Sequence, residues 1–251
     1  QELVKVDISN WNFDSATSLA TMFRFYNRNA VSRGTRTFEV AISTLTSSCT
    51  SFGSMCRDGA VTDIDFRGSD LSGVTTFDHF WLGSYAPSGH VSRFRIDTNA
   101  NLSSVTNMSN FAKTIHTDDY DLLITRLEAT NNNSSGSMAI GASKYSAGLI
   151  FPTVRNKSMT DSTIANKIID ENVDFVELGV SVNDIVETRA GNNYYYAKVS
   201  AVNSSTELTL DANIVSGGRT YNVQTSNVAK ARYDLDVTQS WAVSDGGPVI
   251  E

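Results

Sequence analysis

Several features that would identify a protein quickly are scarce in this chain of 251 residues. It has three prolines, two cysteines and three histidines, and no apolar run approaches the roughly 20 residues that cross a bilayer. Few prolines argue against a linker-rich architecture, and two cysteines give no disulfide framework. We expect no membrane insertion, and we find no signal-peptide pattern.

Positive charge is scarce as well. The 20 Lys and Arg residues are outnumbered by 27 Asp and Glu residues, which gives a formal net charge of -7. A chain with this balance repels phosphate backbones, and its basic residues are scattered singly, so we expect no nucleic-acid partner.

Apolar residues make up 40% of the chain, which is enough to bury a core. The first residue is Gln, so processing and a longer parent protein both stay open.

Motifs of familiar catalytic chemistry are also missing. The sequence has no nucleophile elbow, phosphate loop, dinucleotide fingerprint or zinc-ligand pair. Cys49 and Cys56 lie among apolar neighbours, a pattern typical of buried free thiols. Asp118 and Asp119 stand at an expected helix start, where carboxylates favour the helix dipole. We therefore expect no enzymatic activity, no cofactor and no metal site.

What the sequence does have is a motif that occurs four times before residue 113. Each copy reads small apolar residue, Thr, any residue, large apolar residue, two residues of any kind, then two apolar residues. The threonines are Thr17, Thr50, Thr75 and Thr106. The predicted core positions are Ala16, Leu19, Met22, Cys49, Phe52, Met55, Val74, Phe77, Phe80, Val105, Met108 and Phe111.

Each copy follows an alternating apolar run such as Val4, Val6 and Ile8, and a period of two predicts a short strand with one buried face. Apolar residues three and four apart within the motif predict one or two turns of helix. One such unit buries too little apolar surface to fold alone, so neighbouring units must stack. The pattern therefore predicts an α/β repeat fold, a short solenoid with a strand plus a short helix per unit.

Two of these stretches resemble a known repeat family. LVKVDISNWNFDSATSLATMF (residues 3–23) and LSSVTNMSNF (residues 102–111) are similar to the BspA-like leucine-rich repeats, whose typical unit reads LDLSNWDTSNVTNMSGMF. The resemblance covers residues 3 to about 112, and it implies a leucine-rich-repeat-like solenoid of the kind found in bacterial surface proteins and bacteriophage tail proteins. TDDYDLLITRLEAT, SKYSAG and SWAVSDGG resemble the helix and strands that close such repeats in phage and marine bacterial proteins.

Residues 151–227 have a different texture, with five strand-like runs separated by turn residues. The runs are VDFVELGV, NDIVETRA, YYYAKVSAV, TELTLDANI and TYNVQT. They predict an inserted small all-β domain, an antiparallel barrel or sandwich, and they resemble a small β module common in marine phage structural proteins. We expect residues 1–150 to form the solenoid and the start of its cap, 151–227 the insert, and 228–251 the helix and strand that complete the cap.

Aromatic residues outside the core pattern are the candidates for ligand contact. Tyr194 and Tyr196 share one face of a predicted strand, whereas Tyr195 shares the other face with Ala197 and Val199. A second candidate pair is Trp81 and Tyr85, near the third return loop. Ordinary edge packing of the tyrosines stays open as an alternative.

These features favour a non-enzymatic virion structural protein, namely a bacteriophage tail or tail-fibre component that displays a repeat scaffold for host attachment. The expected location is the virion surface or tail, or otherwise extracellular. The expected partners are other virion proteins and a host-surface glycan or protein, and a homo-oligomer is also consistent with the sequence. Three alternatives stay open: a bacterial cell-surface adhesin, a capsid decoration protein, and a polysaccharide-degrading tail enzyme with paired carboxylates about 5–10 Å apart.

Overall fold

The computed structural model describes residues 5–8, 10–24, 39–58, 61–81, 91–112, 114–133, 135–141, 157–158, 166–190, 193–214 and 220–245. Its elements, in chain order, are β1 (Lys5–Asp7), β2 (Glu39–Ala41), β3 (Asp63–Asp65), β4 (Arg93–Arg95), β5 (Asn107–Met108), α1 (Thr117–Thr130), β6 (Gly136–Ala139), β7 (Lys157–Ser158), β8 (Lys167–Ile169), β9 (Ile185–Ala190), β10 (Asn193–Ser204), β11 (Glu207–Leu210), β12 (Thr220–Gln224), α2 (Asn227–Tyr233), the π-helix η1 (Asp234–Thr238) and β13 (Trp241–Ser244).

The chain divides into two units, which are described separately. Unit 1 consists of Gln1–Tyr145 and Asp234–Pro248, and unit 2 consists of Ser146–Tyr233 and Val249–Glu251. The residues of unit 2 thus interrupt the sequence of unit 1, and α2 belongs to unit 2 whereas η1 and β13 belong to unit 1.

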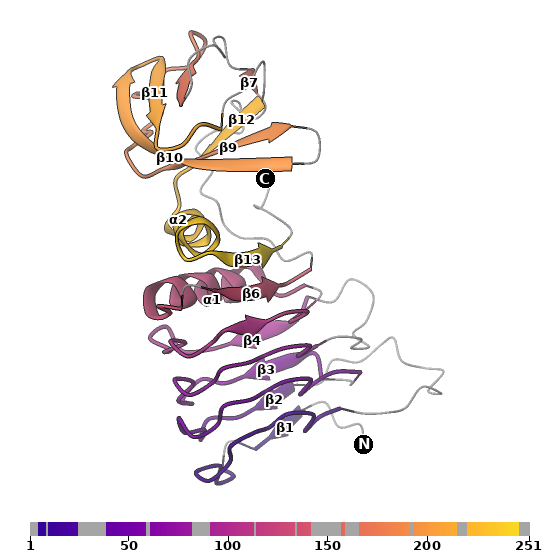
Figure 1. The fold of residues 1–251 in the computed structure, drawn as a ribbon. Coiled ribbons are helices and arrows are strands. Elements are labelled where there is room, and N and C mark those ends of the chain that lie inside the picture. Colours follow the sequence, from indigo (N-terminus) through magenta and orange to yellow (C-terminus); the bar gives the residue numbers. More distant parts are fainter. Residues whose placement is uncertain are drawn as a thin grey trace, which may run out of the picture. The chain divides into compact units, whose positions relative to one another are not determined.

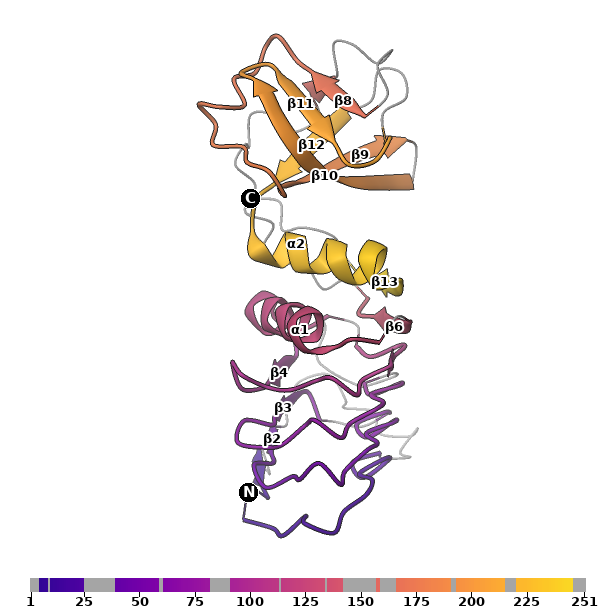
Figure 2. The same ribbon diagram turned by 60° about the vertical axis from the view of Figure 1, so that its left-hand side comes forward.

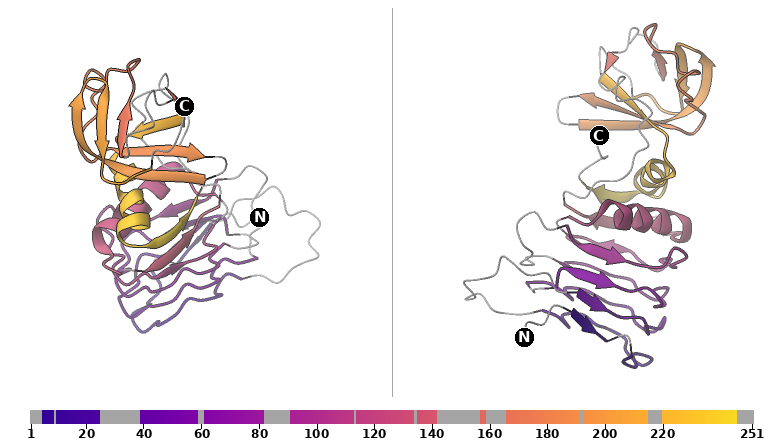
Figure 3. Two further views of the ribbon diagram at one scale, coloured as in Figure 1. Left: turned by 45° about the horizontal axis from the view of Figure 1, so that its top comes forward. Right: turned by 180° about the vertical axis from the view of Figure 1, so that it is seen from behind.

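A parallel sheet forms one side of unit 1. Strands β1, β2, β3 and β4 pair in chain order, with Val6, Val40, Ile64 and Phe94 in register. They are stacked one above the next in Figure 1, and the right-hand view of Figure 3 shows them from behind. Strands β2, β3 and β4 follow the alternation seen in the sequence, and in β3, for example, Ile64 is buried between the half-buried residues Asp63 and Asp65. The predicted short strands are therefore confirmed.

A second parallel ladder runs through the motif segments. Single bridges join Ser18 to Ser51, Ser51 to Thr76, and Thr76 to Asn107. From β5 the ladder continues into β6 and β13, which are also parallel. Figure 2 separates the two ladders, with β2–β4 on one side of unit 1 and β6 and β13 on the other.

An aromatic core fills the space between the two ladders. The Phe52 and Phe77 rings stack with their centroids 5.2 Å apart, and Phe77 meets Phe94 of the first sheet edge to face at 5.7 Å. Phe94 in turn contacts Phe111 at 4.9 Å. Side chains from consecutive motif segments therefore share one interior, and edge-to-face and stacked pairs of this kind stabilise beyond simple burial.

The predicted α/β fold class, a leucine-rich-repeat-like solenoid with a strand plus a short helix per unit, is wrong. The structure is mostly β with two short helices and several sheets, and no solenoid or repeat is detected in it. The motif segments form turns and single bridges, not helix, because Thr21, Ser54 and His79 adopt left-handed φ angles of 62°, 59° and 54°. Apolar residues three apart still point inward, since the chain turns a corner between them.

The predicted core positions are buried with two exceptions in the first motif segment. Ala16 is only half-buried, and Met22 has 36% of its surface exposed, whereas its counterpart Met55 is fully buried. The placement of Met22 in the core was therefore wrong. The cause is positional: among the described residues, no segment packs against the outer side of this first segment.

Helix α1 closes the β4 edge of the first sheet. His116 caps the helix, because its side chain accepts a hydrogen bond from the Asp118 amide. The sequence predicted that Asp118 and Asp119 favour the helix dipole, but the main role of Asp119 is a different one. The Asp119 carboxylate is 7% exposed and accepts hydrogen bonds from the Phe94 amide at 2.9 Å and from Arg93 Nε at 2.6 Å. The Asp119 carboxylate thus satisfies the Phe94 amide at this edge, next to the parallel bridge that joins Ser92 to Ile115.

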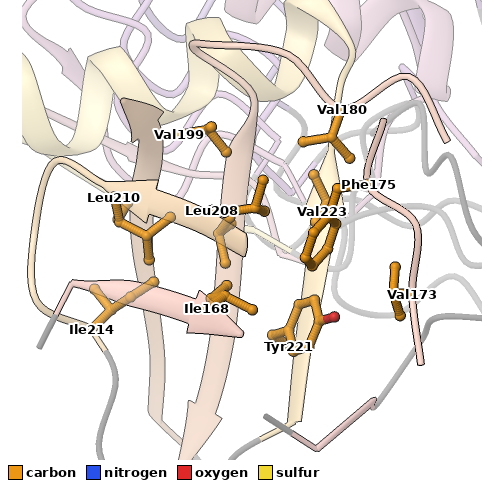
Figure 4. Close-up of a cluster of buried hydrophobic side chains, with 12 residues drawn as sticks. Ile168, Val173, Phe175, Val180, Val199, Leu208, Leu210, Ile214, Tyr221 and Val223 are labelled. Carbon is orange, nitrogen blue, oxygen red and sulfur yellow. The ribbon is translucent and has the colours of Figure 1, made fainter. Parts of the chain in front are cut away.

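Unit 2 contains one curled antiparallel sheet in the order β7-β12-β9-β10-β11-β8. Its apolar face carries a cluster drawn in Figure 4, in which Phe175 lies 6.3 Å from the ring of Tyr221. The Tyr221 hydroxyl donates to buried Asp170 at 2.9 Å, and burial together with this carboxylate raises the pKa of Tyr221. An all-β antiparallel insert was expected, and the sheet is a half-barrel, not a closed one.

One of the expected strands differs from the structure, and another is not described. Residues 173–180 form turns, because Asp174 accepts the amides of Val176 and Glu177 and Gly179 has a φ of 75°. The strand expected at SKYSAG, residues 143–148, lies outside the described residues. Helix was expected after the insert, and α2 and η1 are found there, followed by β13 in the SWAVSDGG stretch.

Candidate functional site

The four threonines of the motif form an exposed row along the second ladder. Every one of them is exposed, and each hydroxyl after the first donates to the carbonyl of the preceding threonine. The three distances are 3.1 Å for Thr50 to Thr17, 3.0 Å for Thr75 to Thr50 and 3.3 Å for Thr106 to Thr75. Because these hydroxyl hydrogens are already engaged, the row presents oxygen lone pairs and methyl groups to solvent.

A second polar row lies one residue further along each segment. Ser18, Ser51 and Thr76 each accept the amide two residues later, at 3.1, 3.4 and 3.1 Å, and Asn107 accepts the Ser109 amide at 2.9 Å. These bonds close the turns and hold the side chains in place. We call the two rows together the hydroxyl face: Thr17, Ser18, Thr50, Ser51, Thr75, Thr76, Thr106 and Asn107.

The hydroxyl face carries no ionisable side chain. The nearest ionisable residues along the chain are Asp14, Asp78 and His79, and His79 Nδ1 lies 2.6 Å from the Asp78 carboxylate. Neighbouring parallel strands lie about 4.8 Å apart, so the rows space their oxygens regularly. The arrangement can make many weak, directional hydrogen bonds to an uncharged partner, and it offers no acid and base for catalysis.

The opposite ladder of unit 1 is charged instead. Arg67 and Asp65 lie 2.6 Å apart, and Arg95 and Glu39 lie 3.6 Å apart. Burial alone would raise the pKa of Asp65, but hydrogen bonds and charge from Arg67 lower it below its ordinary value. These ion pairs lie on one ladder of unit 1, whereas the residues of the hydroxyl face on the other ladder are all uncharged.

Of the four aromatic residues predicted to contact a ligand, the structure describes the side chains of Trp81 and Tyr196. Trp81 is 1% exposed and packs on Phe80 at 4.8 Å, so it is a core residue and not a surface contact. Tyr85 lies outside the described residues. Tyr194 lies in β10, but its side chain is outside the described set, and Tyr196 is half-buried.

Tyr196 belongs to a polar cluster that joins β9, β10, β12 and α2 within unit 2. Arg232 lies over its ring, 5.4 Å from the centroid. Glu187, 4% exposed, accepts a hydrogen bond from Gln224 at 3.1 Å and from Asn222 at 3.4 Å. Burial raises the pKa of Glu187, opposed by hydrogen bonds from Tyr196 and the two amides and by the charge of Arg232. This cluster fastens α2 to the sheet.

The raised pKa of Glu187 predicts a pH dependence of stability. Because the folded-state pKa exceeds the ordinary value of 4.5, the contribution of Glu187 is present below that pH and is lost as pH rises through the folded pKa. Relative to Glu187→Gln, the wild type should therefore lose stability as pH rises above the ordinary value of 4.5. Urea denaturation followed by far-ultraviolet circular dichroism measures the difference.

Glu207→Gln is the matched control, with the opposite sign. Hydrogen bonds from Lys167 and Asn203 lower the pKa of Glu207, so its contribution is present above the ordinary value and is lost as pH falls through the folded pKa. If both variants changed stability with pH in the same direction, the assigned environment of Glu187 would be wrong.

Other chemistry is limited among the described residues. They contain no group of three His, Cys, Asp or Glu side chains that could hold a metal ion. Cys49 and Cys56 are free and buried, and burial raises the pKa of both thiols. No described helix is both long enough and apolar enough to cross a membrane.

Comparison with protein families, curated proteins and solved structures finds no match for this chain. The function is therefore inferred from the chain itself.

Two functional features were not predicted from the sequence. The motif contains Thr at its second position in every copy, so the signal for the hydroxyl face was present, but no contact surface was inferred from it. The electrostatic interaction between Glu187 and Arg232 joins residues far apart in the chain, and no spacing pattern indicates it.

Proposed function

We propose that this chain is a non-enzymatic structural protein of a virion, a tail or tail-fibre component that attaches to a host surface through the hydroxyl face. The observation that carries the proposal is the continuous row of exposed, uncharged threonines, in which each hydroxyl after the first donates to the carbonyl of the preceding threonine. The resemblance of residues 3–112 to repeats of surface and tail proteins supports the same conclusion.

The chemistry of the face favours a neutral glycan as the attachment partner. A sugar offers hydroxyl donors, which match the lone pairs of the threonine oxygens, and C–H groups, which match their methyl groups. Each contact is weak, with a net contribution of about 0.5–1.5 kcal/mol per hydrogen bond, so several in a row are needed for affinity. A face that spans four segments supplies that number.

Replacing two threonines by valine tests the attachment face. Thr50→Val combined with Thr75→Val keeps the shape and removes two oxygens, so affinity for host cells or purified host-envelope polysaccharide should fall about tenfold. Thr44→Val is the matched control, because Thr44 also donates to a carbonyl of the first segment, that of Trp11, but lies beside β2. Binding is measured by whole-cell titration with the labelled protein.

Three results would count against the proposal. Equal binding by the double variant would remove the hydroxyl face from attachment. Release of cleaved glycan on incubation would contradict the non-enzymatic role. Immunogold electron microscopy of intact particles should place the chain on the tail, and its absence from particles would contradict the virion assignment.

A further inference from the structure

Asn107 is the position at which the chemistry of the hydroxyl face changes. The equivalent residues of the three earlier segments are Ser18, Ser51 and Thr76, and parallel bridges join these residues in series and end at Asn107. Each of the three carries a hydroxyl, which can rotate and can both donate and accept a hydrogen bond. Asn107 carries a carboxamide instead, in which the oxygen only accepts and the nitrogen only donates.

The oxygen of the Asn107 amide is engaged within the protein. Oδ1 accepts the Ser109 main-chain N–H at 2.9 Å and the Ser137 hydroxyl of β6 at 3.3 Å. Ser137 Oγ also lies 2.6 Å from Ser109 Oγ, so both hydroxyls and Oδ1 belong to one network. A main-chain N–H only donates, so the atom that it meets must be the amide oxygen. These bonds fix the orientation of the side chain.

The nitrogen of the same amide is left for a ligand. Among the residues that the structure describes, none accepts a hydrogen bond from Asn107 Nδ2. Because Oδ1 is held, Nδ2 is a donor of fixed direction. The Asn107 side chain is half-buried whereas Thr106 beside it is exposed, so the donor is recessed relative to the threonine row. A ligand reaches it best with an acceptor that projects from its own chain.

The acetamido group of an N-acetylated sugar meets this requirement. Its carbonyl oxygen stands further from the sugar ring than a ring hydroxyl does, and it accepts hydrogen bonds without donating. Its methyl group gains from an apolar neighbour, and the threonine methyls of the hydroxyl face supply one. A site that is built to hydrogen-bond one substituent discriminates against an analogue that lacks it.

A charged acceptor is disfavoured at the same place. A ligand carboxylate would also accept a hydrogen bond from Asn107, but the hydroxyl face contains no Lys or Arg to pair with it. The chain as a whole carries a formal net charge of -7, which repels anions. The neutral amide carbonyl avoids this repulsion, so an uncharged N-acetylated sugar fits better than an acidic one.

We propose that Asn107 is a specificity-determining residue of the hydroxyl face and that it selects neutral glycans bearing N-acetyl groups. Asn107 Nδ2 donates to the acetyl carbonyl oxygen, while the threonine row contacts the hydroxyls of neighbouring sugars. This inference rests on the proposed attachment role of the hydroxyl face, and it narrows the ligand from neutral glycans in general to N-acetylated ones.

Two matched oligosaccharides test the selection with the full chain. Oligomers of N-acetylglucosamine and of glucose, with the same linkage and length, differ at one carbon of each sugar, which carries an acetamido group in the first and a hydroxyl in the second. The wild type should bind the N-acetylated oligomer about tenfold more tightly. NMR titration of the isotope-labelled protein measures both dissociation constants, and it also reports on the Asn107 side-chain amide directly.

Asn107→Thr gives the fourth segment the residue that the third has at this position. The Thr76 hydroxyl accepts the amide two residues later at 3.1 Å, so a threonine keeps the turn. The variant should bind the two oligomers equally, with unchanged affinity for the glucose oligomer. Asn101→Ser is the matched control, because Asn101 Oδ1 accepts the Ser103 amide at 3.0 Å in the same kind of turn but lies outside the hydroxyl face. It should leave both affinities unchanged.

The side-chain amide signals of Asn107, identified by their absence from Asn107→Thr, should shift with the N-acetylated oligomer only. The inference is overturned if the wild type binds both oligomers equally, if it binds neither, or if Asn107→Thr keeps the preference. The proposed attachment is judged separately, by the binding of host-envelope polysaccharide and its loss in the Thr50→Val and Thr75→Val double variant. If that loss is seen but Asn107→Thr keeps the preference, the attachment face stands and only the role of Asn107 is wrong.

Discussion

Phe77→Ala should lower the free energy of unfolding of unit 1 by about 3–5 kcal/mol. Phe77 is fully buried and contacts rings from both ladders, at 5.2 Å from Phe52, 5.7 Å from Phe94 and 5.9 Å from Phe111. Truncation removes these contacts and leaves a cavity that rigid neighbours cannot fill. The loss should therefore be a large fraction of the stability of a unit of this size.

Tryptophan fluorescence isolates the effect on unit 1. All three tryptophans, Trp11, Trp81 and Trp241, belong to unit 1, so their emission during urea denaturation reports on that unit. Met22→Ala is the control, since Met22 occupies a motif position yet is exposed, and it should cost less than about 1 kcal/mol. Similar losses in the two variants would mean that the aromatic rings do not form one shared core.

Asp119→Ala should cost about 3 kcal/mol of stability, because it removes three hydrogen bonds and leaves the buried Phe94 amide unsatisfied. The carboxylate also pairs with Arg93, at 2.6 Å to Nε and 2.9 Å to Nη2. The Arg93 side chain is 33% exposed, so solvent screens part of that attraction, and the figure lies at the lower end for a buried pair.

Asp118→Ala separates this role from a general effect of charge at a helix start. The two aspartates are adjacent in the first turn of α1, but the Asp118 side chain is 81% exposed. Its replacement should change the free energy of unfolding by less than about 0.5 kcal/mol. Equal effects of the two substitutions would indicate that both act only on the helix dipole, as the sequence alone suggested.

The strands of unit 1 could be predicted, whereas the conformation of the motif could not. Alternation around Val40, Ile64 and Phe94 has one interpretation, because only a strand buries every second residue. Apolar residues three and four apart fit a helix, but they also fit a turn whose corner points outward. The left-handed φ angles of Thr21 and Ser54 show that the motif forms a turn and not a helix, and hydrophobic periodicity does not reveal such angles.

In unit 2 the regular strands could likewise be predicted from the sequence, whereas one irregular segment could not. Strands β9–β12 lie where β-branched and aromatic runs predicted them. The run at residues 173–180 has similar composition but forms turns, because the Asp174 side chain competes for nearby amides. A local side-chain hydrogen bond of this kind outweighs strand propensity and has no signature in composition.

The candidate site was partly visible in the sequence. Thr17, Thr50, Thr75 and Thr106 stood out as the constant polar position of the motif, but only the parallel ladder shows that they form one row. Of the aromatic candidates, Trp81 failed for a different reason: it has the size of a ligand contact, but burial assigns it to the core. Exposure depends on what packs nearby, which a single sequence does not encode locally.

Cysteine footprinting tests most directly whether the hydroxyl face contacts a host surface. The native thiols Cys49 and Cys56 are buried with raised pKa values, so they react slowly with maleimide. Thr75→Cys places a thiol on the hydroxyl face, and Arg67→Cys places one at the opposite ladder. The rate of modification is measured for each variant with and without host-envelope polysaccharide.

At a polysaccharide concentration about ten times the dissociation constant, the Thr75→Cys thiol should react about tenfold more slowly, with no change at Arg67→Cys. Unchanged rates at Thr75→Cys under conditions where the protein demonstrably binds, or protection at Arg67→Cys instead, would contradict the assignment of the hydroxyl face as the contact surface.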